Sequence, residues 1–117
     1  MDEARLEPVG NGVAAVTDGW FVVNARDAPW VEREGFGKRG RFEFDGRLAA
    51  GTQHEPVHFP QLGICLAVLQ PGELNGYYHG EAGQEDFLVL SGECVAIVEE
   101  QELPLRQWDF LHCPPWT

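Results

Sequence analysis

Short apolar segments separated by turn residues make up the second half of the chain. Each is rich in β-branched or aromatic residues and ends near a glycine, a proline or an acidic pair. No stretch shows the apolar period of about 3.6 residues that marks an amphipathic helix. The pattern predicts strands in residues 63–70, 86–93 and 94–100, and one or two more in 103–113. A series of short strands of this kind is typical of an all-β sandwich or small barrel.

The first half gives weaker signals. Residues 20–24 and 41–45 are apolar or alternating and predict two further strands, and one helical turn is expected after Pro29. Residues 49–61 predict a loop. Residues 87–90 are apolar on both faces, so both side-chain pairs of this segment are expected to be largely buried in a closed barrel.

Length and composition limit the function classes. A chain of 117 residues predicts one domain, residues 1–117, and the net charge of −11 argues against nucleic acid or an anionic membrane as a partner. No apolar run is long enough for a membrane span, and the acidic start is unlike a signal peptide. Three cysteines without close pairs predict reduced thiols and a cytoplasmic location.

The sequence HEPVH, residues 54–58, matches the pattern of zinc proteases. That chemistry requires both histidines on one face of a helix. Pro56 lies between them and opposes a helix, so His54 and His58 are expected to be loop residues.

The stretch YYHGEAGQEDFLVLSGE, residues 77–93, holds the candidate chemistry. In an extended segment His79 and Glu81 point to the same face, because side chains repeat every two residues. A turn at Ala82-Gly83 brings Glu85 to the start of the next strand. One imidazole and two carboxylates suit Mn, Fe(II), Ni or Zn and leave open positions for water or substrate. The alternative is an acidic turn with Glu81 in water.

Two segments resemble the motifs of the cupin superfamily. The first family motif is a glycine, two histidines separated by one residue, a glutamate and another glycine. The second family motif contains an aspartate and a proline. The residues that match are Gly72, His79, Glu81, Glu85, Gly92, Asp109 and Pro114. Residues 62–117 carry these motifs, and residues 1–61 supply N-terminal strands and loops.

This chain departs from the family pattern at several points. Glu81 stands where the family has its second histidine, and Trp108 replaces the glycine before Asp109. The histidine of the second motif would follow Thr117, so the sequence resembles a cupin truncated at its C-terminus. In an alternative register, Tyr78 and Gly80 occupy the two histidine positions and His79 faces away.

The resemblance implies an all-β, cupin-like small barrel (a jelly roll) with a divalent transition metal (Mn, Fe, Ni or Zn) held by His79, Glu81 and Glu85. It implies a small polar ligand inside the barrel and does not choose a reaction. The alternative is a non-catalytic, small-molecule-binding or sensory cupin without metal. A homodimer is expected, because an open sheet edge tends to pair. Further residues expected to contact the ligand are Tyr78, Gln84, Phe87 and His112.

Overall fold

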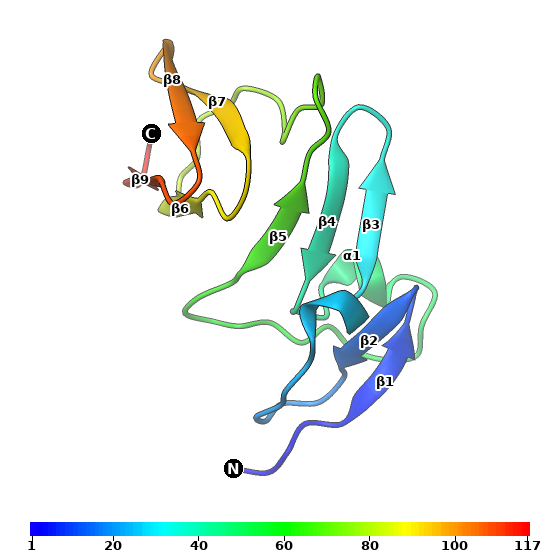
Figure 1. Ribbon diagram of the computed structural model, residues 1–117. Helices are drawn as coiled ribbons and strands as arrows, with labels where there is room; N and C mark the ends of the chain where they lie inside the picture. Colours follow the sequence, from blue (N-terminus) through cyan, green and yellow to red (C-terminus); the bar gives the residue numbers. More distant parts are fainter. The chain divides into compact units, whose positions relative to one another are not determined.

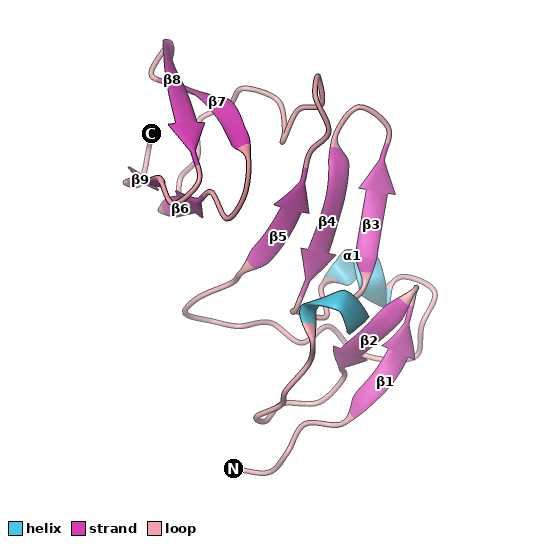
Figure 2. Ribbon diagram, in the orientation of Figure 1, coloured by secondary structure: helices cyan, strands magenta, loops and turns pink.

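The computed structural model describes the backbone of residues 1–117 and every side chain except that of Arg47. The chain forms two compact units, Met1–Gly76 and Tyr77–Thr117 (Figure 1). Strands predominate in both, and all of the sheets are antiparallel (Figure 2). The prediction of a mostly β fold is confirmed. None of the described sheets closes into a barrel, so the predicted closed small barrel is not observed.

The first unit contains a hairpin and a three-stranded sheet. The hairpin pairs β1 (Leu6–Val9) with β2 (Gly12–Ala15), and the sheet has the order β3 (Trp30–Arg33), β4 (Gly37–Arg41), β5 (Cys65–Val68). A short 3₁₀ helix (Ala25–Asp27) precedes β3, and the one-turn helix α1 (Gly46–Ala49) follows β4.

Phe44 is at the centre of the apolar core of this unit. It is fully buried, and the cluster around it includes Val9 and Ala14 from the hairpin, together with Val16. The backbone of Phe44 also forms an isolated β-bridge to Val57. This bridge connects the loop of residues 50–64 to the core. The hairpin and the loop therefore share one small core.

Two contacts fix the hairpin against the start of β3. The amide side chain of Asn11 donates to the carbonyl of Trp30 and accepts from its backbone N–H, each at 2.8 Å. Gly12 approaches Ala28 so closely that a Cβ at this position would lie 2.4 Å from the Ala28 carbonyl carbon. Glycine is required here because any side chain would collide with backbone.

The second unit consists of two strand pairs. In one, β6 (Glu85–Leu88) pairs with β9 (Phe110–Cys113); in the other, β7 (Glu93–Val98) pairs with β8 (Gln101–Arg106). The turn between β7 and β8 places Glu99 and Glu100 at positive φ, 49° and 65°. This is the backbone twist of a tight two-residue hairpin turn.

Several local predictions for the first half are wrong. Residues 20–24 form no strand beyond an isolated bridge at Trp20, and residues 42–45 lie outside β4. The segment after Pro29 is strand β3 and not a helical turn. β3 is a strand because β4 pairs with it, whereas residues 20–24 and 42–45 form only isolated bridges, at Trp20 and Phe44. Residues 49–61 are largely a loop, as predicted.

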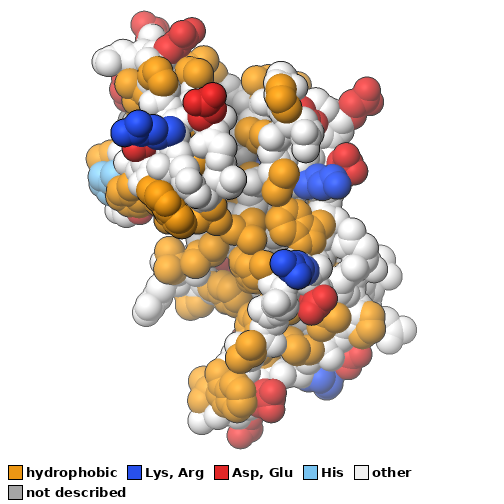
Figure 3. All heavy atoms as spheres, viewed as in Figure 1, with side chains coloured by type: hydrophobic (Ala, Val, Ile, Leu, Met, Phe, Trp, Pro, Cys, Tyr) orange, Lys and Arg blue, Asp and Glu red, His pale blue; other side chains and the backbone are white. Residues whose placement is uncertain are grey.

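The expected burial of residues 87–90 is also wrong. Leu88 and Leu90 are half-exposed, at 51% and 50%, and Phe87 is exposed at 38%. The strand pair β6–β9 has no closed barrel around it to cover both faces. Apolar side chains are visible on the surface in Figure 3. Within the described part of the chain, no helix has the length and apolar character needed to span a lipid bilayer.

Candidate metal centre

The segment that carries the candidate ligands is held by backbone pairing to the last residues of the chain. The N–H of Glu81 donates to the carbonyl of Thr117 at 3.2 Å, and the N–H of Trp116 donates to the carbonyl of Glu81 at 2.7 Å. Four residues further on, Glu85 begins β6 and pairs with Cys113. The segment from Glu81 to Glu85 is therefore fixed at both of its ends.

A third attachment lies just before the segment. The backbone N–H of Glu100, in the turn between β7 and β8, donates to the hydroxyl of Tyr78 at 3.2 Å. Tyr78 is 64% exposed. The hydroxyl thus tethers the residue before His79 to a neighbouring hairpin, and the ligand-binding role predicted for Tyr78 stays a prediction.

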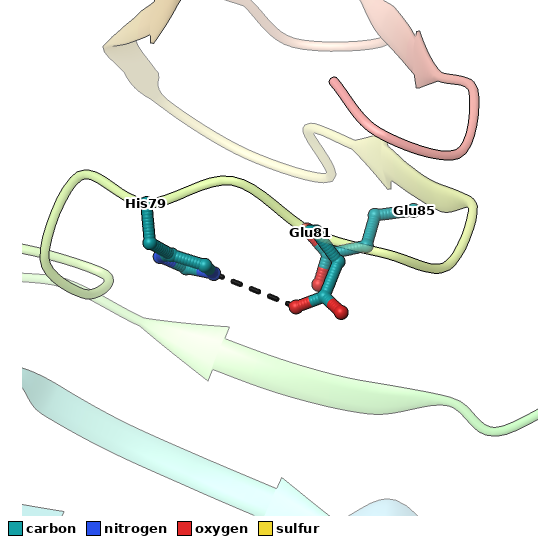
Figure 4. Close-up of side chains that lie close together, drawn as sticks. All are labelled: His79, Glu81 and Glu85. Atoms are coloured by element: carbon teal, nitrogen blue, oxygen red, sulfur yellow. Dashed lines mark ion pairs between the residues drawn. The ribbon is translucent and has the colours of Figure 1, made fainter.

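The structure brings His79, Glu81 and Glu85 together. Each offers one ligand atom, and these atoms all lie within 4.8 Å of one another (Figure 4). The Nε2 atom of His79 lies 3.6 Å from Oε2 of Glu81. Two donors about 2.1 Å from one ion at a tetrahedral angle are about 3.4 Å apart, so this pair fits a shared metal with little adjustment. The arrangement agrees with the register that places His79 and Glu81 on one face.

A backbone hydrogen bond orients the imidazole. Nδ1 of His79 lies 2.6 Å from the carbonyl oxygen of Tyr77. A carbonyl oxygen only accepts, so Nδ1 carries a proton, and Nε2, which faces Glu81, is the nitrogen that a metal would bind after it loses its own proton. Metal-binding histidines commonly have this type of partner, which fixes both tautomer and ring orientation.

The same contacts favour the protonated imidazole when no metal is bound. The hydrogen bond to the Tyr77 carbonyl is the largest cause that raises the pKa of His79 above 6.5, and the negative charges of Glu81 and Glu85 add to it. Partial burial acts in the opposite direction. A cation attracted by the two carboxylates would therefore replace a proton at Nε2.

The donor set fits a borderline divalent transition metal. One imidazole nitrogen and two carboxylate oxygens are ligands that Zn, Fe(II), Mn and Ni accept. The side chains are accessible to water, with 58% of His79 and 43% of Glu81 exposed. Three ligands would leave coordination positions open to solvent.

Gln84 and His112, both expected to bind ligand, meet at Asp86. The amide nitrogen of Gln84 donates to Oδ2 of Asp86 at 2.8 Å, and Nδ1 of His112 lies 2.5 Å from Oδ1. These bonds, that of Gln84 first, lower the pKa of Asp86 below 3.8. Asp86 follows Glu85 in β6 and so points to the opposite face of the strand.

The remaining ligand-binding prediction, Phe87, falls on the same face of β6 as Glu85. Its cross-strand partner is Leu111, and that of Glu85 is Cys113. Burial raises the pKa of the Cys113 thiol, and the charges of Glu85 and Asp86 raise it further. The sequence predicted no ligand-binding role for Asp86 or Cys113; the register of β6 with β9 is what pairs Asp86 with His112 and Cys113 with Glu85.

The HEPVH segment has no helix, as expected. His54 packs its ring against Phe44, and Nδ1 of His58 lies 3.5 Å from a carboxylate oxygen of Glu43. The two histidines thus have separate partners in the loop.

Comparisons with protein-family models, with curated proteins and with solved structures give no match. The relation to cupins therefore stays a prediction that rests on the motif residues.

Proposed function

We propose that this chain binds one divalent transition metal through His79, Glu81 and Glu85 and presents it to a small polar ligand. The observation that carries the proposal is the convergence of the three ligand atoms within 4.8 Å, with the imidazole held in the tautomer that leaves Nε2 available. The reaction is unassigned, and a non-catalytic binding role is consistent with the same residues.

The charges of the three residues suit this role. Two carboxylates balance the two positive charges of the ion, and the neutral imidazole completes the set. A divalent ion here would act as a Lewis acid toward a ligand oxygen and lower the pKa of bound water. Glu81 and Glu85 are fixed by backbone pairing, so little ordering is required when the ion binds.

The resemblance to cupins supports the proposal independently of the geometry. His79, Glu81 and Glu85 coincide with the positions of ligands in the first cupin motif. We retain the cupin-like jelly roll as part of the proposal; the antiparallel pairs β6–β9 and β7–β8 are compatible with that architecture.

The homodimer is also retained. Val95 and Ile97 project from the same face of β7 and are 60% and 55% exposed. A second copy that covered them would remove apolar surface from water. Sedimentation analysis of the purified protein tests this part: a monomer at all concentrations would contradict it.

The metal site is tested by metal analysis and thermal unfolding. The protein, purified without added metal, is assayed for bound Mn, Fe, Ni and Zn, then stripped and titrated with each ion. We expect one ion per chain and a rise in Tm, both lost in His79→Ala and Glu85→Gln. Glu102→Gln, an exposed carboxylate on β8, is the matched control and should behave like wild type. Equal metal binding by wild type and His79→Ala would refute the site.

One observation favours a second function, metal-independent binding of an apolar molecule. The first unit has an open hollow of about 350 Å³ lined by Phe21, Phe42, Phe59 and neighbouring aliphatic residues. Small-molecule sites of similar volume and apolar lining are common. A fluorescent apolar probe that binds wild type but not Phe59→Ala would support this function. Release of the probe when a chelator removes metal would show that probe binding depends on metal.

A further inference from the structure

The structure places a sulfur atom beside the candidate metal centre. Cys113, the last residue of β9, is the direct cross-strand partner of Glu85, the first residue of β6. Directly opposed residues of an antiparallel pair project to the same face, with their Cβ atoms about 4.5–5.5 Å apart. The thiol therefore shares a face with one of the candidate ligands.

Backbone contacts fix Cys113 relative to both carboxylates. On one side of it the β6–β9 ladder continues through Leu111, and on the other side Trp116 and Thr117 bond to the backbone of Glu81. Pro114 follows Cys113 directly, and a residue before proline is restricted to extended backbone. The position of the Cys113 Cβ is thus set by the same pairing that positions Glu81 and Glu85.

From these observations we propose that Cys113 is the fourth ligand of the metal centre and directs it toward thiophilic ions such as Zn²⁺ and Cd²⁺. The inference rests on the function proposed above. The group of ligand atoms mutually within 4.8 Å comprises only His79, Glu81 and Glu85, so coordination would require the Cys113 side chain to turn toward that group about χ1. Cysteine has a single side-chain torsion with three staggered positions, which makes this a small rearrangement. Cys113 is a free thiol and is half-buried, so it is available for such a bond.

A fourth ligand of this kind changes the preferred metal. One nitrogen and two oxygens discriminate weakly among Mn, Fe(II), Ni and Zn, whereas thiolate ligands select Zn and other soft or borderline ions over Mn. A set of one nitrogen, two oxygens and one sulfur also completes the tetrahedron that zinc adopts in structural sites. Cys113 would thus decide which metal the site retains.

The test compares wild type with Cys113→Ser, with Cys113→Ala as a second variant. Cys94→Ser is the matched control, because Cys94 is an exposed cysteine of the same unit on β7. Circular dichroism verifies that each variant folds. Affinities for Zn²⁺, Cd²⁺ and Mn²⁺ are measured by competition with a chelator, and Co²⁺ serves as a spectroscopic probe for thiolate coordination.

We expect the Co²⁺ complex of wild type to show a sulfur-to-cobalt charge-transfer band in the near ultraviolet. Both Cys113 variants should lose this band and bind Zn²⁺ and Cd²⁺ about tenfold or more weakly, with less than about a threefold change for Mn²⁺. Cys94→Ser should match wild type.

Three results would overturn the inference. If Co²⁺ binds to wild type in a manner that depends on His79 and Glu85 but gives no sulfur band, Cys113 is not a ligand and the three-ligand site stands. Equal Zn²⁺ affinities of wild type and both Cys113 variants lead to the same conclusion. If wild type binds none of these ions, both the fourth ligand and the proposed function are wrong.

Discussion

Protons and metal ions should compete at His79, and the competition has a defined pH dependence. The hydrogen bond to Tyr77 and the charges of Glu81 and Glu85 raise the pKa of His79 above 6.5. A metal bound at Nε2 must displace the proton. Below the pKa of His79, the apparent Kd for metal should therefore rise about tenfold for each unit of pH.

The magnitude follows from mass action. Metal at 100 times its Kd stabilises the folded state by about 2.7 kcal/mol when His79 is neutral. One unit below the pKa of His79 the same metal concentration should give about 1.4 kcal/mol, and two units below about 0.4 kcal/mol. The metal-induced rise in Tm should thus be nearly lost over two pH units.

The metal-free protein should show the opposite trend. A raised pKa means that the folded chain holds the proton more tightly than the unfolded chain does. The corresponding stabilisation is fully present below pH 6.5 and is lost as the pH rises through the raised pKa. Thermal unfolding with and without Zn²⁺, at several pH values, separates the two effects.

Replacement of Glu81 tests why the pKa of His79 is raised. In Glu81→Gln one of the charges that favour the imidazolium is removed, so the pKa of His79, followed by NMR of the ring protons, should fall relative to wild type. Glu102→Gln is the matched control and should leave it unchanged. A pKa at or below 6.5 in metal-free wild type, or equal values in wild type and Glu81→Gln, would refute the electrostatic reasoning.

Two predictions concern stability. The Tm difference between wild type and Asp86→Asn should be fully present above pH 3.8 and should disappear as the pH falls through the lowered pKa of Asp86. The reason is that the hydrogen bonds from Gln84 and His112 stabilise only the carboxylate form. A Tm difference that does not change with pH would contradict this. Gly12→Ala should cost about 1–3 kcal/mol in chemical denaturation, since its Cβ would meet the backbone of Ala28, whereas Gly76→Ala, with open space around it, should be nearly neutral. Equal costs at the two glycines would show that the close approach is not rigid.

The strands that sequence reasoning found are those whose side chains carry the signal themselves. β5 and β9 lie within predicted segments, and β6, β7 and β8 overlap them; most of these strands are rich in branched or aromatic residues. The strands that were missed, β1 to β4 except for Arg41 at the end of β4, contain proline, glycine or several charges, as in LEPV and WVER. They are strands because a neighbour pairs with them, and a single sequence does not show which neighbour that is.

The contacts of the candidate site are likewise of two kinds, those between residues close in the sequence and those that depend on strand pairing. His79 and Glu81 are two residues apart, and Glu85 follows the turn at Ala82-Gly83, so their convergence is a local property that alternation together with this turn predicts. The Asp86–His112 pair and the Glu85–Cys113 pair join residues more than twenty positions apart in the sequence. Both depend on the register of β6 with β9, and a slip by one residue would move Cys113 to the face of Asp86 and bring His112 to that of Glu85. The three-ligand core of the proposed centre could thus be predicted from the sequence, but its proposed fourth ligand is defined only by the strand pairing.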